Sequence, residues 1–296
     1  MRFSVYQESH VGGRDMNQDR MGYCYTRDAL LLVLADGMGG HPHGEVAATV
    51  ALEAISALFR QQAGPYVKGP ARFLEDACHA AHREIHRHAV VHGLADVPRT
   101  TIVACLVQHG SATWAHCGDS RLYLLRGGRV LARTRDHSHV EKLIGADLVP
   151  ASARLAHPDR NKLYNCLGAA RPPLVELSPP ARLEAGDVML LCSDGLWAAL
   201  PEEQLVATLS TGALASAVPG LLRAALRNAG PGGDNATGLA IAWQEGPDVP
   251  GAGSTIVCTE SAPGPLAGAA DPFDEAEIER AIAEIRAAID KSSQLL

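Results

Sequence analysis

Residues 30 to 41 read Leu-Leu-Leu-Val-Leu-Ala-Asp-Gly-Met-Gly-Gly-His. The run Leu30–Leu34 is short and aliphatic, which predicts a β-strand. The strand ends near a carboxylate, Asp36, and the glycines that follow it are typical of a turn. This stretch therefore predicts a sheet in which one strand delivers an acidic side chain to an edge.

Other short runs that are rich in β-branched and aliphatic residues are strand candidates as well. Together with the first they are Phe3–Gln7, Gly22–Thr26, Leu30–Leu34, Thr101–Gln108, Ala112–Cys117, Arg121–Leu125, Val188–Cys192 and Thr237–Trp243. Turn residues at Arg27-Asp28, His109-Gly110 and Gly127-Gly128 join several of them. Such turns indicate antiparallel hairpins and meanders.

Four longer segments have the pattern of helices. They are Gly44–Gln62, Ala71–His92, Glu202–Leu209 and Ala213–Asn228. A pair of helices on each side of the strand groups predicts an α+β fold, a layered sandwich of strands flanked by helix pairs.

The character of the chain changes after Trp243. Residues 245–270 are rich in Gly, Pro, Ala, Ser and Thr without a hydrophobic period, which predicts a flexible linker after a domain at 1–244. Residues 271–296 predict an acidic amphipathic helix whose apolar stripe needs a partner surface. Docking on a separate protein, docking on the first domain and self-association are the alternatives. The isoleucines of the stripe are Ile278, Ile282, Ile285 and Ile289.

Composition and charge restrict the class of protein. No apolar run approaches the roughly 20 residues of a membrane-spanning helix, and the N-terminus has no signal-peptide hydrophobic region, so we expect a cytoplasmic protein without membrane insertion. The seven cysteines contain no CxxC pair, so we expect them to be reduced and mostly buried. Residues 271–296 carry seven acids and three bases, and residues 245–270 carry three acids, so the first 244 residues sum to about zero within the chain total of −7. Without a basic stripe, we expect no nucleic-acid partner.

Four aspartates stand in turn-like settings at the ends of strand candidates: Asp36, Asp119, Asp194 and Asp234. Any one of them alone is more simply a turn residue, because Asp-Gly pairs are common in turns. Four together can converge on one edge of a sandwich, and oxygen ligands without His or Cys suit Mg²⁺ or Mn²⁺. A two-metal hydrolase is the natural interpretation. Arg14, followed by Asn17-Gln18-Asp19, adds a side chain suited to grip a phosphate through two parallel hydrogen bonds.

The motifs Arg-x-x-Asn-Gln-Asp, Asp-Gly-Met-Gly-Gly-His, Gly-Asp-Ser-Arg, Ser-Asp-Gly-Leu and Gly-Asp-Asn-Ala-Thr occur in this order over residues 1 to 244. In combination they resemble the bacterial members of the PP2C (PPM) family of serine/threonine protein phosphatases. The resemblance implies an α-β-β-α sandwich of two antiparallel sheets flanked by helices. It also implies a binuclear Mn²⁺ or Mg²⁺ centre at one end of the sandwich.

Carried over residue by residue, the resemblance makes Asp36 the carboxylate that bridges two metal ions. Gly37 then offers its backbone carbonyl to the second ion, and Asp194 and Asp234 complete the shell of the first. Asp119 matches an acid that, with Asp194, holds a third and weaker ion. Arg14 matches the phosphate-binding arginine. Gln18 and Asp19 match positions that orient metal-bound waters.

The activity implied is hydrolysis of phosphoserine and phosphothreonine on proteins by a metal-activated bridging hydroxide that attacks phosphorus in line, opposing serine/threonine kinases. Phosphoproteins, and a cognate kinase, are the implied partners. Some relatives have a histidine after the Asp-Gly pair, where this chain has Met38. A metal-bound water is then the expected proton donor to the leaving group, with His41 or His43 as the alternative.

Two segments depart from the family pattern. Residues 138–168 resemble a flap beside the active site, but Asn165-Cys166 replaces an arginine that many relatives carry. Arg99, before Thr100-Thr101, stands where relatives often have glycine. Two rival functions remain, a two-metal phosphodiesterase or nuclease and a non-catalytic scaffold that only binds phosphoproteins. The lack of a basic groove weighs against the first and the full set of aspartates against the second.

Overall fold

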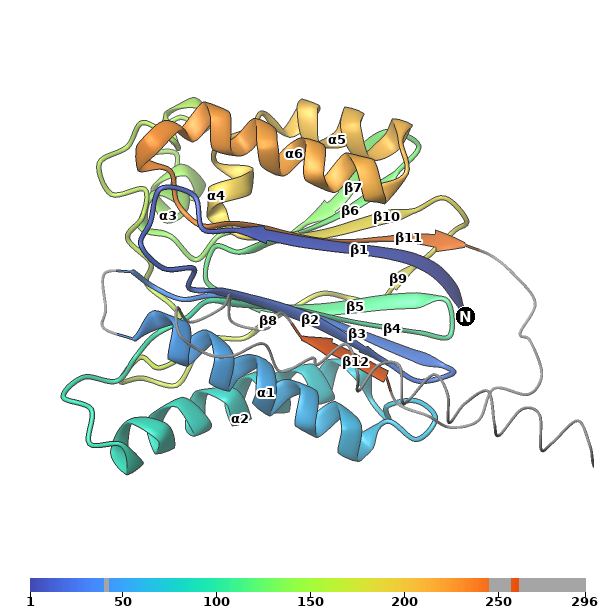
Figure 1. Cartoon of the computed structure of the whole chain (residues 1–296), viewed down its shortest axis with the longest axis horizontal. Helices are drawn as coiled ribbons and strands as arrows, with labels where there is room; N and C mark the ends of the chain where they lie inside the picture. The colour runs from blue at the N-terminus through green and yellow to red at the C-terminus, as the bar shows by residue number, and fades with distance from the viewer. Residues whose placement is uncertain (40–42, 245–256, 261–296) are drawn as a thin grey trace, which may run out of the picture. The chain divides into compact units, whose positions relative to one another are not determined.

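Strand β3 (Ala29–Asp36), which ends in the first aspartate, lies inside one of two antiparallel β-sheets. The structure is a computed structural model that describes residues 1–39, 43–244 and 257–260. These residues belong to one structural unit, residues 1–261. In this unit the two sheets stack face to face and helices cover the outer face of each (Figure 1).

The first sheet joins strands that lie far apart in the sequence, whereas four neighbouring strands of the second sheet follow one another along the chain. The first has the order β1 (Arg2–His10), β11 (Ala236–Gln244), β10 (Val188–Cys192), β6 (Arg121–Arg126) and β7 (Arg129–Arg133). The second has the order β12 (Val257–Glu260), β2 (Asp19–Tyr25), β3, β4 (Ile102–Gln108), β5 (Ser111–Cys117) and β8 (Glu176–Leu177), and β9 (Ala181–Arg182) also pairs with β5. The three predicted turns connect β2 to β3, β4 to β5 and β6 to β7, which confirms the hairpins.

The helices divide between the two outer faces, as the sequence predicted. The longer pair, α1 (Gly44–Gln62) and α2 (Pro70–Val91), packs on the β12 to β8 sheet. The other sheet is covered by α4 (Asp194–Trp197), α5 (Glu202–Thr211) and α6 (Leu214–Ala229). The α-β-β-α sandwich is therefore confirmed.

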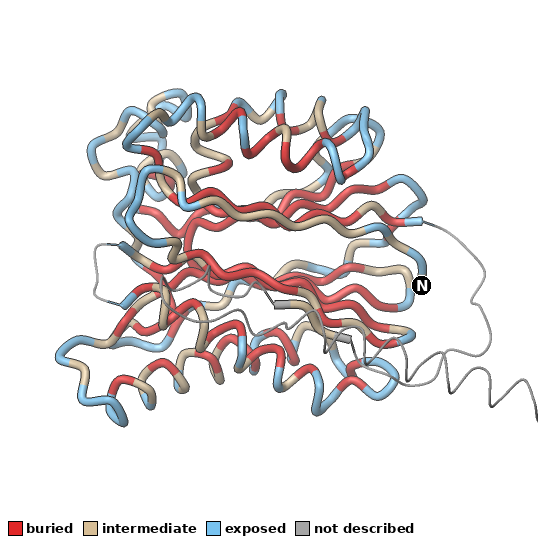
Figure 2. The backbone as a smooth tube through the Cα atoms, in the orientation of Figure 1, coloured by how far each residue is buried: buried red, intermediate tan, exposed pale blue. Residues whose placement is uncertain are grey.

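Strand β3 shows why a continuous aliphatic run is needed in this architecture. Leu31 and Val33 pack against α1 and α2, whereas Leu30, Leu32 and Leu34 point into the layer between the sheets. Successive side chains of a strand alternate between its faces, so a strand that is covered on both sides must be apolar throughout. Figure 2 shows the resulting burial of both sheets.

The linker prediction for residues 245–270 is wrong at residues 257–260. These residues form β12, which adds an antiparallel strand to the edge of β2. The physical reason is that the unpaired backbone groups of an edge strand accept any short extended segment that reaches them. The pairing also places Cys258 opposite Cys24, and the two form a disulfide, so the prediction that all cysteines are reduced is wrong for this pair. The other five cysteines are free and buried.

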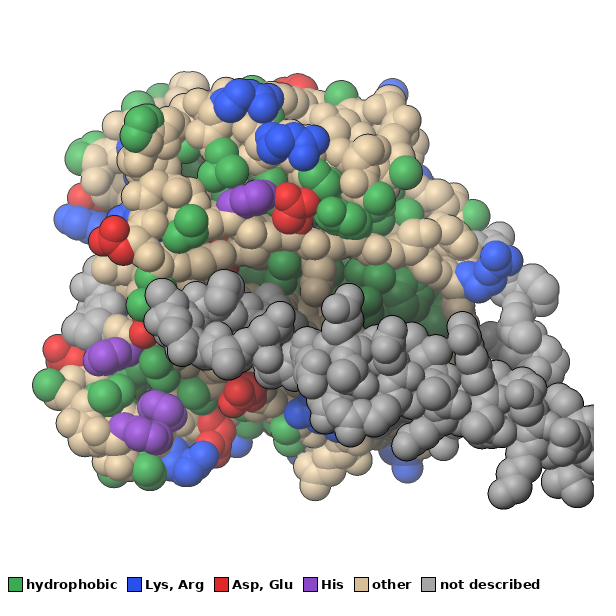
Figure 3. Space-filling view, viewed as in Figure 1, with side chains coloured by type: hydrophobic (Ala, Val, Ile, Leu, Met, Phe, Trp, Pro, Cys, Tyr) green, Lys and Arg blue, Asp and Glu red, His purple; other side chains and the backbone are tan. Residues whose placement is uncertain are grey.

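The predicted C-terminal helix lies outside the described residues. Within them, no helix combines the length and the apolar character that crossing a bilayer requires. On the face drawn in Figure 3, basic and acidic side chains are interspersed, and no broad basic surface crosses the described part of that face.

Candidate active site

The end of β3 is held through the backbone of Asp36 and not through its carboxyl group. The carbonyl oxygen of Asp36 accepts hydrogen bonds from Thr101 N at 2.8 Å and Thr100 Oγ1 at 2.9 Å, and Asp36 N donates to Thr101 Oγ1 at 3.1 Å. The Gly37 backbone packs so closely on the Gly44 carbonyl at the start of α1 that a Cβ would overlap it. These contacts fix the end of the strand, where Asp36 lines a cavity.

The other three aspartates reach the same place from other loops. Asp119 lies in the turn between β5 and β6, Asp194 is the first residue of α4 after β10, and Asp234 precedes β11. The four carboxylates line one cavity of about 650 Å³ together with Arg14 and Gly37. The remaining lining residues are Met38, Gly39, Arg99, Thr101, Asn161, Lys162 and Leu163.

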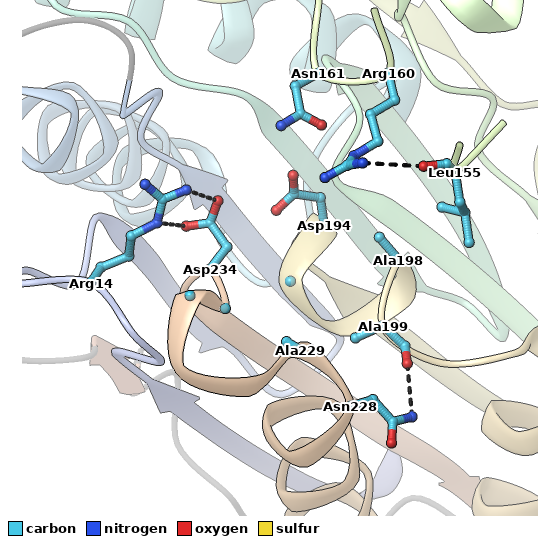
Figure 4. Close-up of a pocket in the computed structure, with 13 residues that line it drawn as sticks. Arg14, Leu155, Arg160, Asn161, Asp194, Ala198, Ala199, Asn228, Ala229 and Asp234 are labelled. Carbon is cyan, nitrogen blue, oxygen red and sulfur yellow. Dashed lines mark hydrogen bonds and ion pairs between the residues drawn. The ribbon is translucent and has the colours of Figure 1, made fainter. Parts of the chain in front are cut away.

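Arg14 lies on the loop after β1 and is oriented by one of these aspartates. Its Nε and one terminal nitrogen donate to the two carboxylate oxygens of Asp234 at 3.0 and 2.8 Å. Figure 4 shows this pair, with the Asp194 side chain beside it, among the residues that line a neighbouring pocket of about 410 Å³. The guanidinium is half exposed, so the pair remains accessible from solvent.

Gln18 and Asp19 do not line the cavity but stand directly behind it. Asp19 is buried, and its Oδ2 accepts hydrogen bonds from Ser193 Oγ at 2.8 Å and Thr237 Oγ1 at 2.6 Å. Its Oδ1 has no hydrogen-bond partner among the described residues, which is costly for a buried carboxylate oxygen. Gln18 connects the β2 and α1 sides of the site through its side-chain bond to Glu45 at 3.1 Å.

The carboxylates strongly influence one another's protonation. Burial, followed by the charges of Asp19 and the other three aspartates, raises the pKa of Asp36 well above its ordinary value. Burial and the charges of Asp119 and Asp234 do the same to the pKa of Asp194. Burial and Asp136 raise the pKa of Asp119 to about 7. So many buried acids ionise together only when cations accompany them.

The donor set therefore fits divalent metal ions of the hard, oxygen-binding kind. Carboxylates, a backbone carbonyl and the unpaired Asp19 Oδ1 supply oxygen ligands or hydrogen-bond acceptors only. Among the described residues, neither histidine nor cysteine lines this cavity.

Asp119 is held by contacts that the sequence did not reveal. Its carbonyl oxygen accepts a hydrogen bond from Trp197 Nε1 at 2.9 Å, and Arg121 stacks 3.5 Å over the Trp197 ring. The guanidinium of Arg121 makes two 2.8 Å bonds to Asp136 in a fully buried ion pair. The only available signal was the spacing of Asp119 and Arg121 in the Gly-Asp-Ser-Arg motif.

A second chain of hydrogen bonds connects the flap segment to the same turn. Asn165 Nδ2 donates to His137 Nδ1 at 2.7 Å, and Gly118 N donates to the same nitrogen at 3.2 Å. Two donors on Nδ1 place the ring proton on Nε2, which points to Glu176 at 3.3 Å. Although atoms of His116, His137 and Glu176 lie within 4.8 Å of one another, this tautomer leaves His137 without a lone pair for a metal.

The position of His43 gives little support to it as the proton donor. Met38 lines the cavity, whereas His43 does not, and the His43 side chain is 51% exposed with Nδ1 at 3.8 Å from Glu45. His41 lies outside the described residues. Of the histidines on α2, His82 accepts a hydrogen bond from Gly168 N and His86 contacts the Ala169 carbonyl, so these two fasten the end of the flap and the residue after it.

Comparison with known proteins agrees with this geometry. Residues 6–228 match the family described as Protein phosphatase 2C. The chain belongs to the protein phosphatase 2C family. It is 32% identical over 212 residues to the serine/threonine protein phosphatase PstP of Mycobacterium tuberculosis, a match that covers 71% of this chain and 39% of PstP. A match to the serine/threonine phosphatase stp of Listeria monocytogenes, 28% identical, covers 65% of this chain and 77% of that protein.

Solved structures of bacterial serine/threonine phosphatases have the same fold as this chain. Stp1 from Staphylococcus aureus superposes with a TM-score of 0.76 at 27% identity, covering 83% of this chain and 96% of that one. The catalytic domain of PstP in complex with two manganese ions gives 0.68 at 28% identity, covering 82% and 99%. As a protein phosphatase 2C family member, this chain thus spans well under half of the full length of PstP but nearly all of the solved domains.

Proposed function

We propose that this chain is a divalent-metal-dependent phosphatase that removes phosphate from phosphoserine and phosphothreonine side chains of proteins. The observation that carries the proposal is the single cavity lined by Asp36, Asp119, Asp194 and Asp234 with Arg14 at its rim, in a member of the protein phosphatase 2C family. Related proteins are named serine/threonine protein phosphatases, which supports the substrate class.

Two Mn²⁺ or Mg²⁺ ions are the cofactors that we propose. Asp36 would hold both ions, the Gly37 carbonyl the second, and Asp194 and Asp234 the first. Asp119 and Asp194 would hold a third, weaker ion. When bound, the ions would lower the pKa of a nucleophilic water toward neutrality and offset negative charge on the phosphoryl group.

Arg14 would bind the phosphate of the substrate. Its bidentate pairing with Asp234 has the fork geometry that guanidinium also uses with phosphate oxygens. Held at the rim by a carboxylate, the guanidinium is preorganised to meet an incoming phosphate and to stabilise charge as it builds up on the oxygens.

Asp19 and Gln18 would orient water in the site. The Ser193 and Thr237 hydroxyl groups fix Asp19 through Oδ2 and leave Oδ1 as a buried acceptor for a water proton. Because Met38 brings no acid to the cavity and His43 lies outside its lining, we propose that water supplies the proton to the leaving alkoxide.

The substrates that we propose are phosphoproteins made by serine/threonine kinases. The domain boundary at residue 244 and the partner-binding role of the C-terminal helix also remain proposals.

A substrate panel tests the proposal against the phosphodiesterase alternative. With Mn²⁺, the protein should hydrolyse phosphothreonine and phosphoserine peptides and p-nitrophenyl phosphate, but not bis(p-nitrophenyl) phosphate. Faster hydrolysis of the diester than of the monoesters would reject the phosphatase assignment.

A further inference from the structure

Among the described residues, three basic side chains line the cavity, and they differ in whether a carboxylate pairs with them. Arg14 is paired with Asp234, and Lys162 is paired with Asp159 at 2.8 Å. The side chain of Arg99 makes no hydrogen bond or ion pair to any described residue, and its Nε is buried without a partner. A buried donor on a charged group that lacks a partner costs free energy, so an unpaired guanidinium in a cavity wall requires an explanation.

The backbone of Arg99 explains its position but leaves its charge unused. Its carbonyl oxygen accepts a hydrogen bond from Met38 N at 3.0 Å, and the next two residues, Thr100 and Thr101, fasten Asp36. Arg99 is thus fixed beside the Gly37–Met38 turn. Glycine would satisfy these backbone contacts equally well, so the side chain is not required for them.

Arg99 also approaches the cavity from a different side than Arg14. Arg14 follows β1 of one sheet, whereas Arg99 precedes β4 of the other. Arg14 interacts electrostatically with Asp234, Asp194 and Asp36. The strongest charge interactions of Asp36 and Asp194 are with other aspartates and not with Arg99. The buried Cys166 thiol lies in the field of Arg99 but, being neutral, provides no countercharge.

We propose that Arg99 binds an acidic side chain of the substrate, next in sequence to the phosphorylated residue, and so makes this enzyme prefer phosphopeptides with acidic neighbours. The proposal rests on the proposed phosphatase function. A guanidinium recognises carboxylates bidentately, and its counterion would arrive with the substrate. Arg99 would act on specificity, while Arg14 binds the phosphate that is removed.

The test compares two phosphothreonine peptides that differ only in flanking Glu or Gln, with p-nitrophenyl phosphate as the reference without flanks. The wild type should favour the Glu peptide in kcat/KM by about tenfold, the size of one charge-assisted contact. Arg99→Gln should lose most of this ratio through a higher KM, and Arg99→Lys should retain part of it. Arg72→Gln, a matched change at a side chain 87% exposed on α2, should keep the full ratio.

An unchanged Glu-to-Gln ratio in Arg99→Gln would overturn the proposal. An equal loss on both peptides and on p-nitrophenyl phosphate would overturn it too, because Arg99 would then act on the phosphate or on the Met38 turn. If the wild type hydrolyses no peptide, the proposed function fails separately. Fluorescence anisotropy of the labelled Glu peptide then decides alone, with weaker binding expected in Arg99→Gln and equal binding rejecting the inference.

Discussion

Arg14 and Asp234 show how one pair of residues can serve two ligands. In this structure the guanidinium and carboxylate satisfy each other with two hydrogen bonds. In the proposed function each has a further partner, phosphate for Arg14 and a cation for Asp234. The two roles are therefore coupled, and a change at Arg14 has to be examined for both.

We expect Arg14→Ala to raise KM for a phosphothreonine peptide by about tenfold or more, with a smaller fall in kcat, because a bidentate charged contact to the phosphate is lost. Steady-state kinetics measure the split, and calorimetry with Mn²⁺ shows whether Asp234 still binds the metal. Arg14→Lys keeps the charge but not the forked geometry of the guanidinium. Its KM should lie between the KM of the wild type and that of Arg14→Ala. An unchanged KM would show that Arg14 does not bind the phosphate.

Asp119 gives a pH-dependent prediction for the metal-free protein. Burial, and then Asp136, raise its pKa from 3.8 to about 7, so the folded state holds the proton more tightly than the unfolded state. This group therefore reduces stability as pH rises from about 4 to 7. Asp119→Asn removes the loss. In the presence of a chelator at pH 8, the melting temperature of the variant should be several degrees above that of the wild type, since 1 kcal/mol corresponds to roughly 2–4 °C. The two melting temperatures should converge near pH 4.

Thermal melts at a series of pH values measure this difference, and Asp76→Asn on the exposed face of α2 is the matched control. A difference that does not vary with pH would contradict the assigned pKa.

At the residue scale, the sequence predicted which aspartates form the site but not the ion pairs and hydrogen bonds around them. Asp36 and Asp234 were visible because glycine-rich turns beside strand candidates mark them. The ion pair of Arg121 with Asp136, and the bond from Asn165 to His137, join residues 15 and 28 positions apart and depend on how the chain between them folds back. No local pattern encodes such contacts, and the burial of Arg99 Nε is of the same kind.

At the element scale, strands and helices with a strong period were predictable to within a few residues. The α1 helix and β10 have the predicted bounds. The missed elements are short: α3 (His139–Gly145) has seven residues, β7 has five, and α4, β8, β9 and β12 contain two to four each. Segments of this length carry too little pattern, and pairing with an existing strand determines the short strands β8, β9 and β12 instead.

The edge strand β12 gives a prediction of its own, because the Cys24–Cys258 disulfide attaches it to β2 across 234 residues of sequence. Closing a loop of this length restricts the unfolded chain, so Cys258→Ser should lose about 2–4 kcal/mol of unfolding free energy under oxidising conditions. Urea denaturation with and without a thiol reductant measures the loss, and reductant should abolish the difference. Seven free thiols in the denatured, non-reduced wild type, instead of the five that the disulfide leaves, would show that the bond does not form in solution.

At the scale of the whole molecule, function is concentrated where loops of both sheets meet. The loops after β1, β3, β5 and β10 and before β4 and β11 supply the cavity, and the layers of the sandwich serve to place them. The family and this layering could be predicted because the motifs are spread over the first 244 residues. The acidic stretch at the end of the chain has no counterpart in those motifs.

Truncation separates the roles of the two regions after β11. A chain that ends at Ser261 keeps β12 and the disulfide, and we expect it to hydrolyse p-nitrophenyl phosphate as the full chain does. It should lose any partner or oligomeric mass that the predicted C-terminal helix would provide. A chain that ends at Gln244 should be less stable as well. Loss of Mn²⁺-dependent hydrolysis in the Ser261 truncation would mean that residues 262–296 belong to the catalytic unit.

The central claim is that the aspartate cavity is a metal-dependent phosphatase site. The most direct measurement is the initial rate of phosphothreonine-peptide hydrolysis by the wild type and Asp36→Asn, with Mn²⁺ and with a chelator, alongside melting curves that verify folding. We predict rapid hydrolysis by the wild type with Mn²⁺, none with the chelator, and none by folded Asp36→Asn under either condition, because Asp36 would hold both ions. Full Mn²⁺-dependent turnover in Asp36→Asn, or hydrolysis by the wild type that survives the chelator, would contradict the account.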